Sequence, residues 1–147
     1  MSERSDYRTG ASGIAYIRRG VGEPLVLLHG VGSSLRMWDS LIADVAGCRD
    51  AIAVDLPGFG RSPLGDTVMS VAGYVDALSR LLAGLGIDRA HIAGHSFGGA
   101  IALEAGRRGM ARSVVAFAPI GFWGAAGGVW AQWSLLRAHA ASRRLVP

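Results

Sequence analysis

The residue pattern best suited to chemistry is a serine set between glycines, Gly94-x-Ser96-x-Gly98. It follows the short apolar run Ala90 to Ala93 and precedes a helical stretch of small residues. The Gly-x-Ser-x-Gly pattern also occurs at ordinary glycine-rich helix starts. The prediction of a nucleophile therefore depends on the position of the pattern between a strand and a helix. In such a turn, the nucleophile elbow, the serine hydroxyl stands above the sheet and only small neighbours leave room for the backbone. Ser96 is therefore the predicted nucleophile.

Two backbone amides are predicted to serve that nucleophile. Acyl transfer passes through an oxyanion, and each donor that stabilises it is typically worth a few kcal/mol. The N–H of Phe97 directly follows the nucleophile, and the N–H of Val31 lies between Gly30 and Gly32 after the apolar run 24–28. We expect His29, at the end of that run, to be a structural hydrogen-bonding residue and not a base.

A serine hydroxyl also needs a base and a group that orients the base. After Ser96 the only carboxylate is Glu104 and the only histidine is His139. Glu104 lies more than ~10 Å down a helix at 1.5 Å per residue, too far for an orienting acid. We expect His95 to point into the fold and His91 to be an ordinary strand residue. The sequence thus predicts a chain that ends before its catalytic acid and base.

Short apolar runs alternate with helical periods along the chain, which indicates a parallel sheet covered by helices. The predicted fold class is α/β, a doubly wound, mostly parallel sheet with flanking helices and a ligand site at the strands' C-terminal ends. Ser33 or Ser34 is expected to cap the first helix. Predicted strands span 12–19, 24–28, 51–54, 90–93 and 113–118, and predicted helices span 35–45, 71–85 and 97–108.

A third motif runs from Asp55 to Ser62, a glycine- and proline-rich turn that Asp55 and Arg61 are expected to fix. His29-Gly30, this turn and Gly94 to Gly99, in that order, resemble the α/β-hydrolase fold superfamily, and within it the small soluble esterase, haloperoxidase-like and C–C-hydrolase branch. The resemblance covers roughly 12–119. It implies a triad in the chain order Ser, Asp or Glu, His, and a fold truncated after the sixth strand and the start of the lid.

The expected domain organisation follows from that resemblance: 1–120 form the N-terminal core and 121–147 begin the lid. Trp123, Trp130 and Trp133 fall in the lid region. Such a helix would roof an apolar pocket for a small hydrophobic acyl or ring-bearing substrate. Equally, these aromatic side chains would cover the missing half of the core. Both interpretations stay open.

Composition narrows the function classes. Half of the residues are hydrophobic and 18% are charged, which is typical of a folded domain. One cysteine excludes an intrachain disulfide, and we expect no metal and no cofactor. The polar first ten residues do not form a secretory signal, so a cytoplasmic location is predicted. All fifteen basic residues are arginines, mostly scattered, which argues against nucleic-acid binding. The uncharged stretch 113–136 is broken by glycines and a proline, so no membrane span is expected.

The predicted function is that of an esterase-type serine hydrolase. A cofactor-free haloperoxidase, an acyltransferase or a C–C hydrolase would use the same frame. A P-loop or dinucleotide site is excluded, since neither glycine pattern is present. A degenerate binding protein, or half of a split enzyme completed by a C-terminal polypeptide, is the non-enzymatic alternative. The truncated sheet should expose an apolar edge strand, so self-association is also expected.

Overall fold

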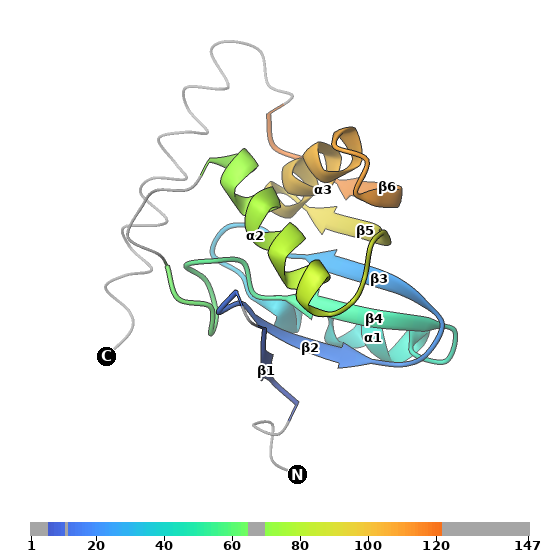
Figure 1. Ribbon diagram of the computed structural model, residues 1–147. Helices are drawn as coiled ribbons and strands as arrows, with labels where there is room; N and C mark the ends of the chain where they lie inside the picture. The colour runs from blue at the N-terminus through green and yellow to red at the C-terminus, as the bar shows by residue number, and fades with distance from the viewer. Residues whose placement is uncertain (1–5, 11, 65–69, 122–147) are drawn as a thin grey trace.

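The computed structural model describes residues 6–10, 12–64 and 70–121 (Figure 1). Within them, six strands form one sheet in the order β1-β2-β4-β3-β5-β6. β3, β4, β5 and β6 run parallel, whereas β1 and β2 are antiparallel additions at one edge. The α/β fold class is confirmed. The elements are β1 (Arg8–Thr9), β2 (Ala15–Arg19), β3 (Glu23–Leu28), η1 (Leu35–Trp38), α1 (Asp39–Val45), β4 (Arg49–Val54), α2 (Val71–Gly84), β5 (Ala90–His95), α3 (Phe97–Arg107) and β6 (Ala111–Phe117).

Two local features differ from the sequence prediction. The two-residue strand β1 was not predicted, because so short a segment carries no periodicity. The predicted first helix begins as the 3₁₀ turn η1, and Ser34 is its N-cap, with Oγ accepting from the N–H of Arg36 at 3.4 Å. The N–H of Leu35 donates to Asp55 Oδ1 at 2.7 Å instead of to a helical carbonyl. This side-chain acceptor ties the start of η1 to the end of β4.

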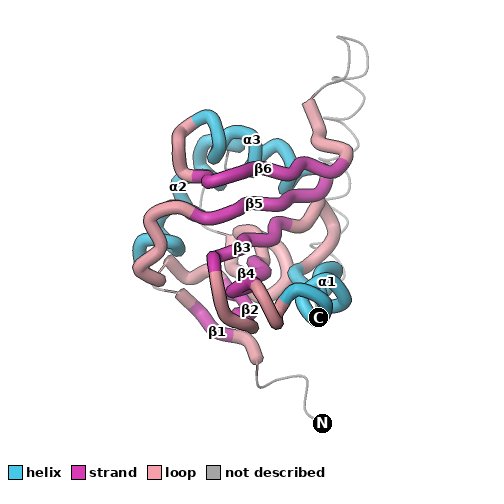
Figure 2. The backbone as a smooth tube through the Cα atoms, turned by 90° about the vertical axis from the view of Figure 1, so that its right-hand side faces the viewer, coloured by secondary structure: helices cyan, strands magenta, loops and turns pink. Residues whose placement is uncertain are grey.

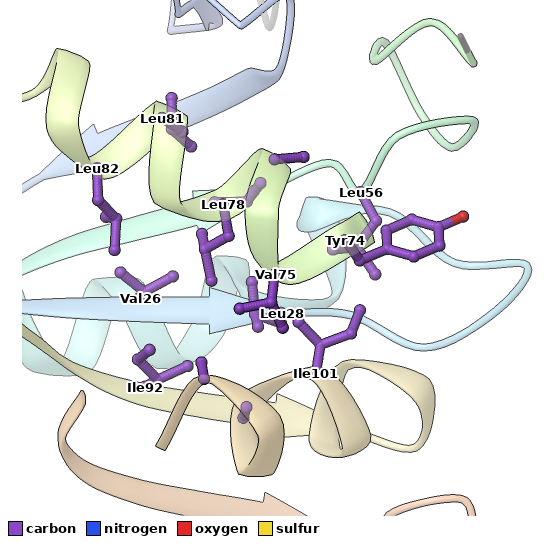
Figure 3. Close-up of a cluster of buried hydrophobic side chains, with 14 of the residues drawn as sticks. Val26, Leu28, Leu56, Tyr74, Val75, Leu78, Leu81, Leu82, Ile92 and Ile101 are labelled. Atoms are coloured by element: carbon purple, nitrogen blue, oxygen red, sulfur yellow. The ribbon is translucent and has the colours of Figure 1, made fainter. Parts of the chain in front are cut away.

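Helices cover both faces of the sheet (Figure 2). α2 and α3 pack on one face, where Val26 and Leu28 of β3 meet Val75 and Leu78 of α2 (Figure 3). η1 and α1 pack on the other face, where a smaller cluster includes Leu27. Neighbouring residues of β3 thus point to opposite faces, as the strand period of two requires. Because β3, β4, β5 and β6 are parallel, their C-terminal ends lie at the same edge of the sheet.

β6 lies at the end of the sheet opposite β1 (Figure 1). It pairs with β5, and its other edge has no partner strand among the described residues. Val115 and Phe117 are each 49% exposed. The predicted apolar edge strand is therefore present, and the described part of the uncharged stretch 113–136 begins as a strand. No helix in the described ranges has both the length and the apolar character needed to cross a bilayer.

Candidate functional site

Ser96 occupies the sharp turn between β5 and α3, as the sequence predicts. Its backbone has φ 52° and ψ −111°, which is uncommon for a residue with a side chain. Three hydrogen bonds hold this conformation. Ser96 N donates to the carbonyl of Phe117 at 2.9 Å, and the Ser96 carbonyl accepts from the amides of Ala100 and Ile120, each at 3.2 Å. A strained backbone conformation that surrounding hydrogen bonds hold in place is typical of functional sites.

Glycines make this turn sterically possible. A Cβ on Gly98 would collide with the carbonyl oxygens of Leu28 and His29, and a Cβ on Gly94 would collide with Gly98. The start of α3 therefore lies directly against the end of β3. A Cβ on Gly30 would lie 3.2 Å from Ser96 Cβ. The structure thus brings the loop that follows β3 beside the predicted nucleophile.

The two predicted oxyanion donors, the amides of Val31 and Phe97, have no acceptor among the described residues. Phe97 is the first residue of α3, so its amide has no acceptor within the helix. Throughout the described ranges, no hydrogen bond uses the amide of Val31 or that of Phe97. The positive end of the α3 dipole also favours an anion at this position. The role of both amides in holding a ligand oxygen stays a prediction.

His29 has the structural role that the sequence predicts. Its ring is fully buried, and Nε2 accepts from the N–H of Leu56 at 3.0 Å. The proton therefore resides on Nδ1, which donates to the Gly30 carbonyl at 2.7 Å. Burial lowers the pKa of this imidazole. Its one lone pair is already occupied, so His29 cannot accept a proton from Ser96.

The bond from His29 also orients a predicted oxyanion donor. The peptide group that joins Gly30 to Val31 is planar and trans, so its C=O and N–H point in opposite directions. His29 Nδ1 and the amide of Ser33 both hold the Gly30 oxygen. The N–H of Val31 must therefore point away from His29.

Asp55 fixes the turn after β4, as predicted. The carboxylate is fully buried and accepts from the amide of Leu35 at 2.7 Å and from the amide of Arg61 at 2.8 Å. Ser62 Oγ donates to the Asp55 carbonyl at 2.6 Å. Arg61 contributes through its main chain, because its guanidinium lies over the Tyr7 ring at 3.9 Å. The Asp55 carboxylate therefore has a structural role: it joins the start of η1 to the turn 55–62 that follows β4.

Glu104 forms ion pairs with two arginines, Arg107 and Arg108, on the surface of α3. Arg107 lies 2.7 Å away and Arg108 lies 2.9 Å away. Hydrogen bonds from these two guanidinium groups lower the carboxyl pKa to about 2. Glu104 therefore stays ionised and paired, which agrees with the expectation that it does not orient a catalytic histidine.

Neither histidine of β5 forms a hydrogen bond with Ser96 in the part of the chain that the structure describes. His91 bonds to Ser113 Oγ at 2.7 Å and to Glu23 at 3.0 Å. It lies near the start of β5, roughly 16 Å along the strand from Ser96 at 3.3 Å per residue. His95 is half-buried, and its Nδ1 lies 3.1 Å from the Cβ position of Gly30, without a hydrogen-bond partner among the described residues. That it points into the fold stays a prediction.

Several predicted residues lie outside the described residues, namely Trp123, Trp130, Trp133 and His139. The lid interpretation therefore stays a prediction. Within 6–10, 12–64 and 70–121, no group of three or more His, Cys, Asp or Glu side chains is placed to hold a metal ion.

The burial of His29 predicts a specific dependence of stability on pH. The pKa of His29 lies below its ordinary value of 6.5, so the folded protein binds fewer protons than the unfolded chain as pH falls through that value. The contribution of His29 to the free energy of unfolding should be fully present above pH 6.5. It should decline as the pH falls below 6.5, down to the pKa of His29 in the folded state. Urea unfolding midpoints measured from pH 8 to pH 5 should fall less steeply in His29→Asn. Equal slopes in both proteins would contradict the prediction.

The sequence profile that describes the α/β hydrolase fold matches residues 23–115. Together with the sheet order and the turn at Ser96, this match shows that the chain belongs to the α/β hydrolase fold family. The match begins at β3 and ends in β6, so it includes Ser96, Val31 and Phe97 but not Phe117 and Ile120, which also hold the turn.

Among curated proteins, the chain is similar to acyl-transfer and hydrolytic proteins. It is 35% identical over 115 residues to the dihydrolipoyllysine-residue acetyltransferase component of the acetoin cleaving system of Cupriavidus necator, covering 74% of this chain and 30% of that protein. It is 39% identical over 83 residues to 1-acylglycerol-3-phosphate O-acyltransferase ABHD5 of Sus scrofa, covering 54% and 24%. It is 32% identical over 95 residues to a carbamate hydrolase, RutD, of Azorhizobium caulinodans, covering 65% and 36%.

Solved structures show the same likeness. A bacterial membrane phospholipase A superimposes with a TM-score of 0.73 at 29% identity, covering 81% of this chain and 40% of that one. The esterase RhEst1 from Rhodococcus sp. ECU1013 superimposes with a TM-score of 0.68 at 31% identity, covering 78% and 46%. The chain thus spans less than half the length of these relatives.

Proposed function

We propose that this chain carries the nucleophile and the oxyanion donors of a serine hydrolase that acts on a carboxylic ester or a related acyl substrate. The observation that carries the proposal is the strained turn at Ser96 beside the loop that follows β3. Ser96 Oγ forms a bond to the carbonyl carbon, the alcohol leaves, and water then releases the acid. The amides of Val31 and Phe97 hold the oxygen that becomes negative.

The proposed substrate is small and hydrophobic. An open, mostly apolar hollow of about 330 Å³ lies over α2 and α3, with the ion-paired Glu104 and Arg107 on its wall. Its other lining residues are Val71, Ala100, Leu103, Ile120 and Gly121. Because the amides of Ala100 and Ile120 also bond to the Ser96 carbonyl, this hollow borders the turn. An acyl chain or a ring near Ser96 would find apolar side chains there.

Acyl transfer to an acceptor other than water is the second candidate. The names of two relatives, an acetyltransferase component and an O-acyltransferase, favour it. The first half of the reaction would be the same, with the acyl group on Ser96. The acceptor would then decide between hydrolysis and transfer. In both cases we propose that the acid and the base lie outside the described residues. They would come either from other sequence of this protein or from a complementing C-terminal polypeptide.

Covalent labelling tests the proposal. A fluorophosphonate should phosphonylate Ser96 slowly in the 147-residue chain and faster once the acid and the base are supplied. Peptide mass spectrometry should place the adduct on the peptide that contains Ser96. Ser96→Ala should abolish the adduct. Ser113→Ala is the matched control, because Ser113 Oγ is the hydroxyl that His91 contacts at 2.7 Å, and this variant should label as fast as the unaltered chain. An adduct that survives in Ser96→Ala and disappears in Ser113→Ala would refute the assignment.

A further inference from the structure

Tyr74 joins two parts of the site that are far apart in the sequence. It lies in the first turn of α2, and its ring is buried. Figure 3 shows the side chain extending from α2 beside Leu56. The ring meets the ring of Phe97 edge to face, with centroids 4.9 Å apart and an interplanar angle of 89°. The hydroxyl donates to the carbonyl of Pro57 at 3.2 Å.

The ring contact leads to one predicted oxyanion donor. Phe97 carries the amide that follows the nucleophile, and its side chain packs against the larger core cluster. Edge-to-face aromatic pairs have a preferred geometry and contribute about 0.5–1.5 kcal/mol beyond area burial. The Tyr74 ring therefore restricts where the first residue of α3 can lie.

The hydroxyl contact leads to the other donor by a series of hydrogen bonds. Pro57 directly follows Leu56, whose N–H donates to His29 Nε2 at 3.0 Å. His29 Nδ1 in turn holds the Gly30 carbonyl at 2.7 Å. That carbonyl belongs to the same peptide group as the N–H of Val31, so its position sets the direction of the donor.

We propose that Tyr74 is a positioning residue that places both oxyanion donors, Phe97 through its ring and Val31 through its hydroxyl. The inference rests on the proposed function, because it concerns the donors of that same site. Tyr74 touches no reacting atom. Its effect passes through Phe97 on one side, and through Pro57, Leu56 and His29 on the other.

Two substitutions separate the routes. Tyr74→Phe keeps the ring and removes the hydroxyl, so it should disturb the Val31 amide and leave the Phe97 amide unchanged. Tyr74→Leu removes both contacts and should disturb both amides. Tyr16→Phe is the matched control, since it removes a hydroxyl from another buried tyrosine of the same core cluster.

Amide chemical shifts from nitrogen-15 NMR spectra provide a readout that does not depend on activity. We expect Tyr74→Phe to shift the Val31 resonance, Tyr74→Leu to shift the Val31 and Phe97 resonances, and Tyr16→Phe to shift neither. If Tyr74→Leu does not fold, Tyr74→Phe still decides the hydroxyl route. An unmoved Val31 resonance in Tyr74→Phe, or an equal shift in Tyr16→Phe, would overturn the inference.

Phosphonylation kinetics give the functional readout. Misplacement of catalytic groups by about 1 Å can cost 10²-fold in rate. We expect the maximal rate of Ser96 phosphonylation to fall about 3- to 10-fold in Tyr74→Phe and about 10- to 100-fold in Tyr74→Leu, with the half-saturating probe concentration unchanged. An unchanged maximal rate in both variants would overturn the inference. If a chain that also carries the acid and the base is not labelled at Ser96 at all, the proposed function fails, and the NMR shifts still decide the role of Tyr74.

Discussion

Gly98→Ala should lower the free energy of unfolding by about 3 kcal/mol or more, although it replaces the weaker helix former with the stronger one. Helix propensity alone would favour alanine by up to about 1 kcal/mol. The added Cβ would overlap the carbonyl oxygens of Leu28 and His29, which are main-chain atoms of the central strand and of the loop beside Ser96. Overpacking typically costs about 1–3 kcal/mol, and more when the backbone must move.

Thermal unfolding followed by circular dichroism measures this effect. A loss of about 3 kcal/mol corresponds to roughly 10 °C in a chain of this size. Gly47→Ala is the control, because Gly47 is exposed and no atom would approach its Cβ within 4 Å. It should be neutral or slightly stabilising. A Gly98→Ala variant as stable as Gly47→Ala would show that α3 can move away from β3, and the tight approach would not be required.

The parts of the fold that repeat a pattern could be predicted from the sequence. Buried parallel strands appear as continuous apolar runs, and α2 shows its apolar face at helical spacing. The turn at Ser96 was predicted because glycine at 94 and 98 is a local steric requirement. Each of these signals lies within a few residues of the structure that it specifies.

Contacts between distant segments could not be predicted in the same way. The sequence analysis does not single out Tyr74, since a tyrosine on the apolar face of a helix shows only that it is buried. Its partners, Pro57 and Phe97, lie 17 and 23 residues away, and only the packing of α2 over the β3–β5 region brings them together. The bond from Leu56 to His29 likewise joins two loops. Such contacts depend on the sheet order, which single-sequence patterns do not encode.

The 147-residue chain should hydrolyse an activated ester at least about 100-fold more slowly than a chain extended at its C-terminus through the downstream coding sequence. In the described ranges no hydrogen bond joins a histidine to Ser96: the lone pair of His29 is occupied, His91 contacts Glu23 and Ser113, and His95 Nδ1 has no partner. General-base assistance typically contributes about 10²–10⁴-fold. Without it, Ser96 keeps its proton, and the two amides alone leave a small residual rate above that of water.

Turnover of p-nitrophenyl butyrate by the 147-residue chain, by its Ser96→Ala variant and by the extended chain tests this expectation.

The same samples should differ in size on gel filtration. The β6 edge, with Val115 and Phe117 half exposed, favours self-association of the shorter chain, and added sequence that covers this edge should reduce it. Full activity in the 147-residue chain that disappears in Ser96→Ala would show that an internal group acts as the base. His95 and His139 would then be the first residues to substitute. The contacts of His29 and His91 already account for their ring nitrogens, whereas His95 Nδ1 has no partner among the described residues.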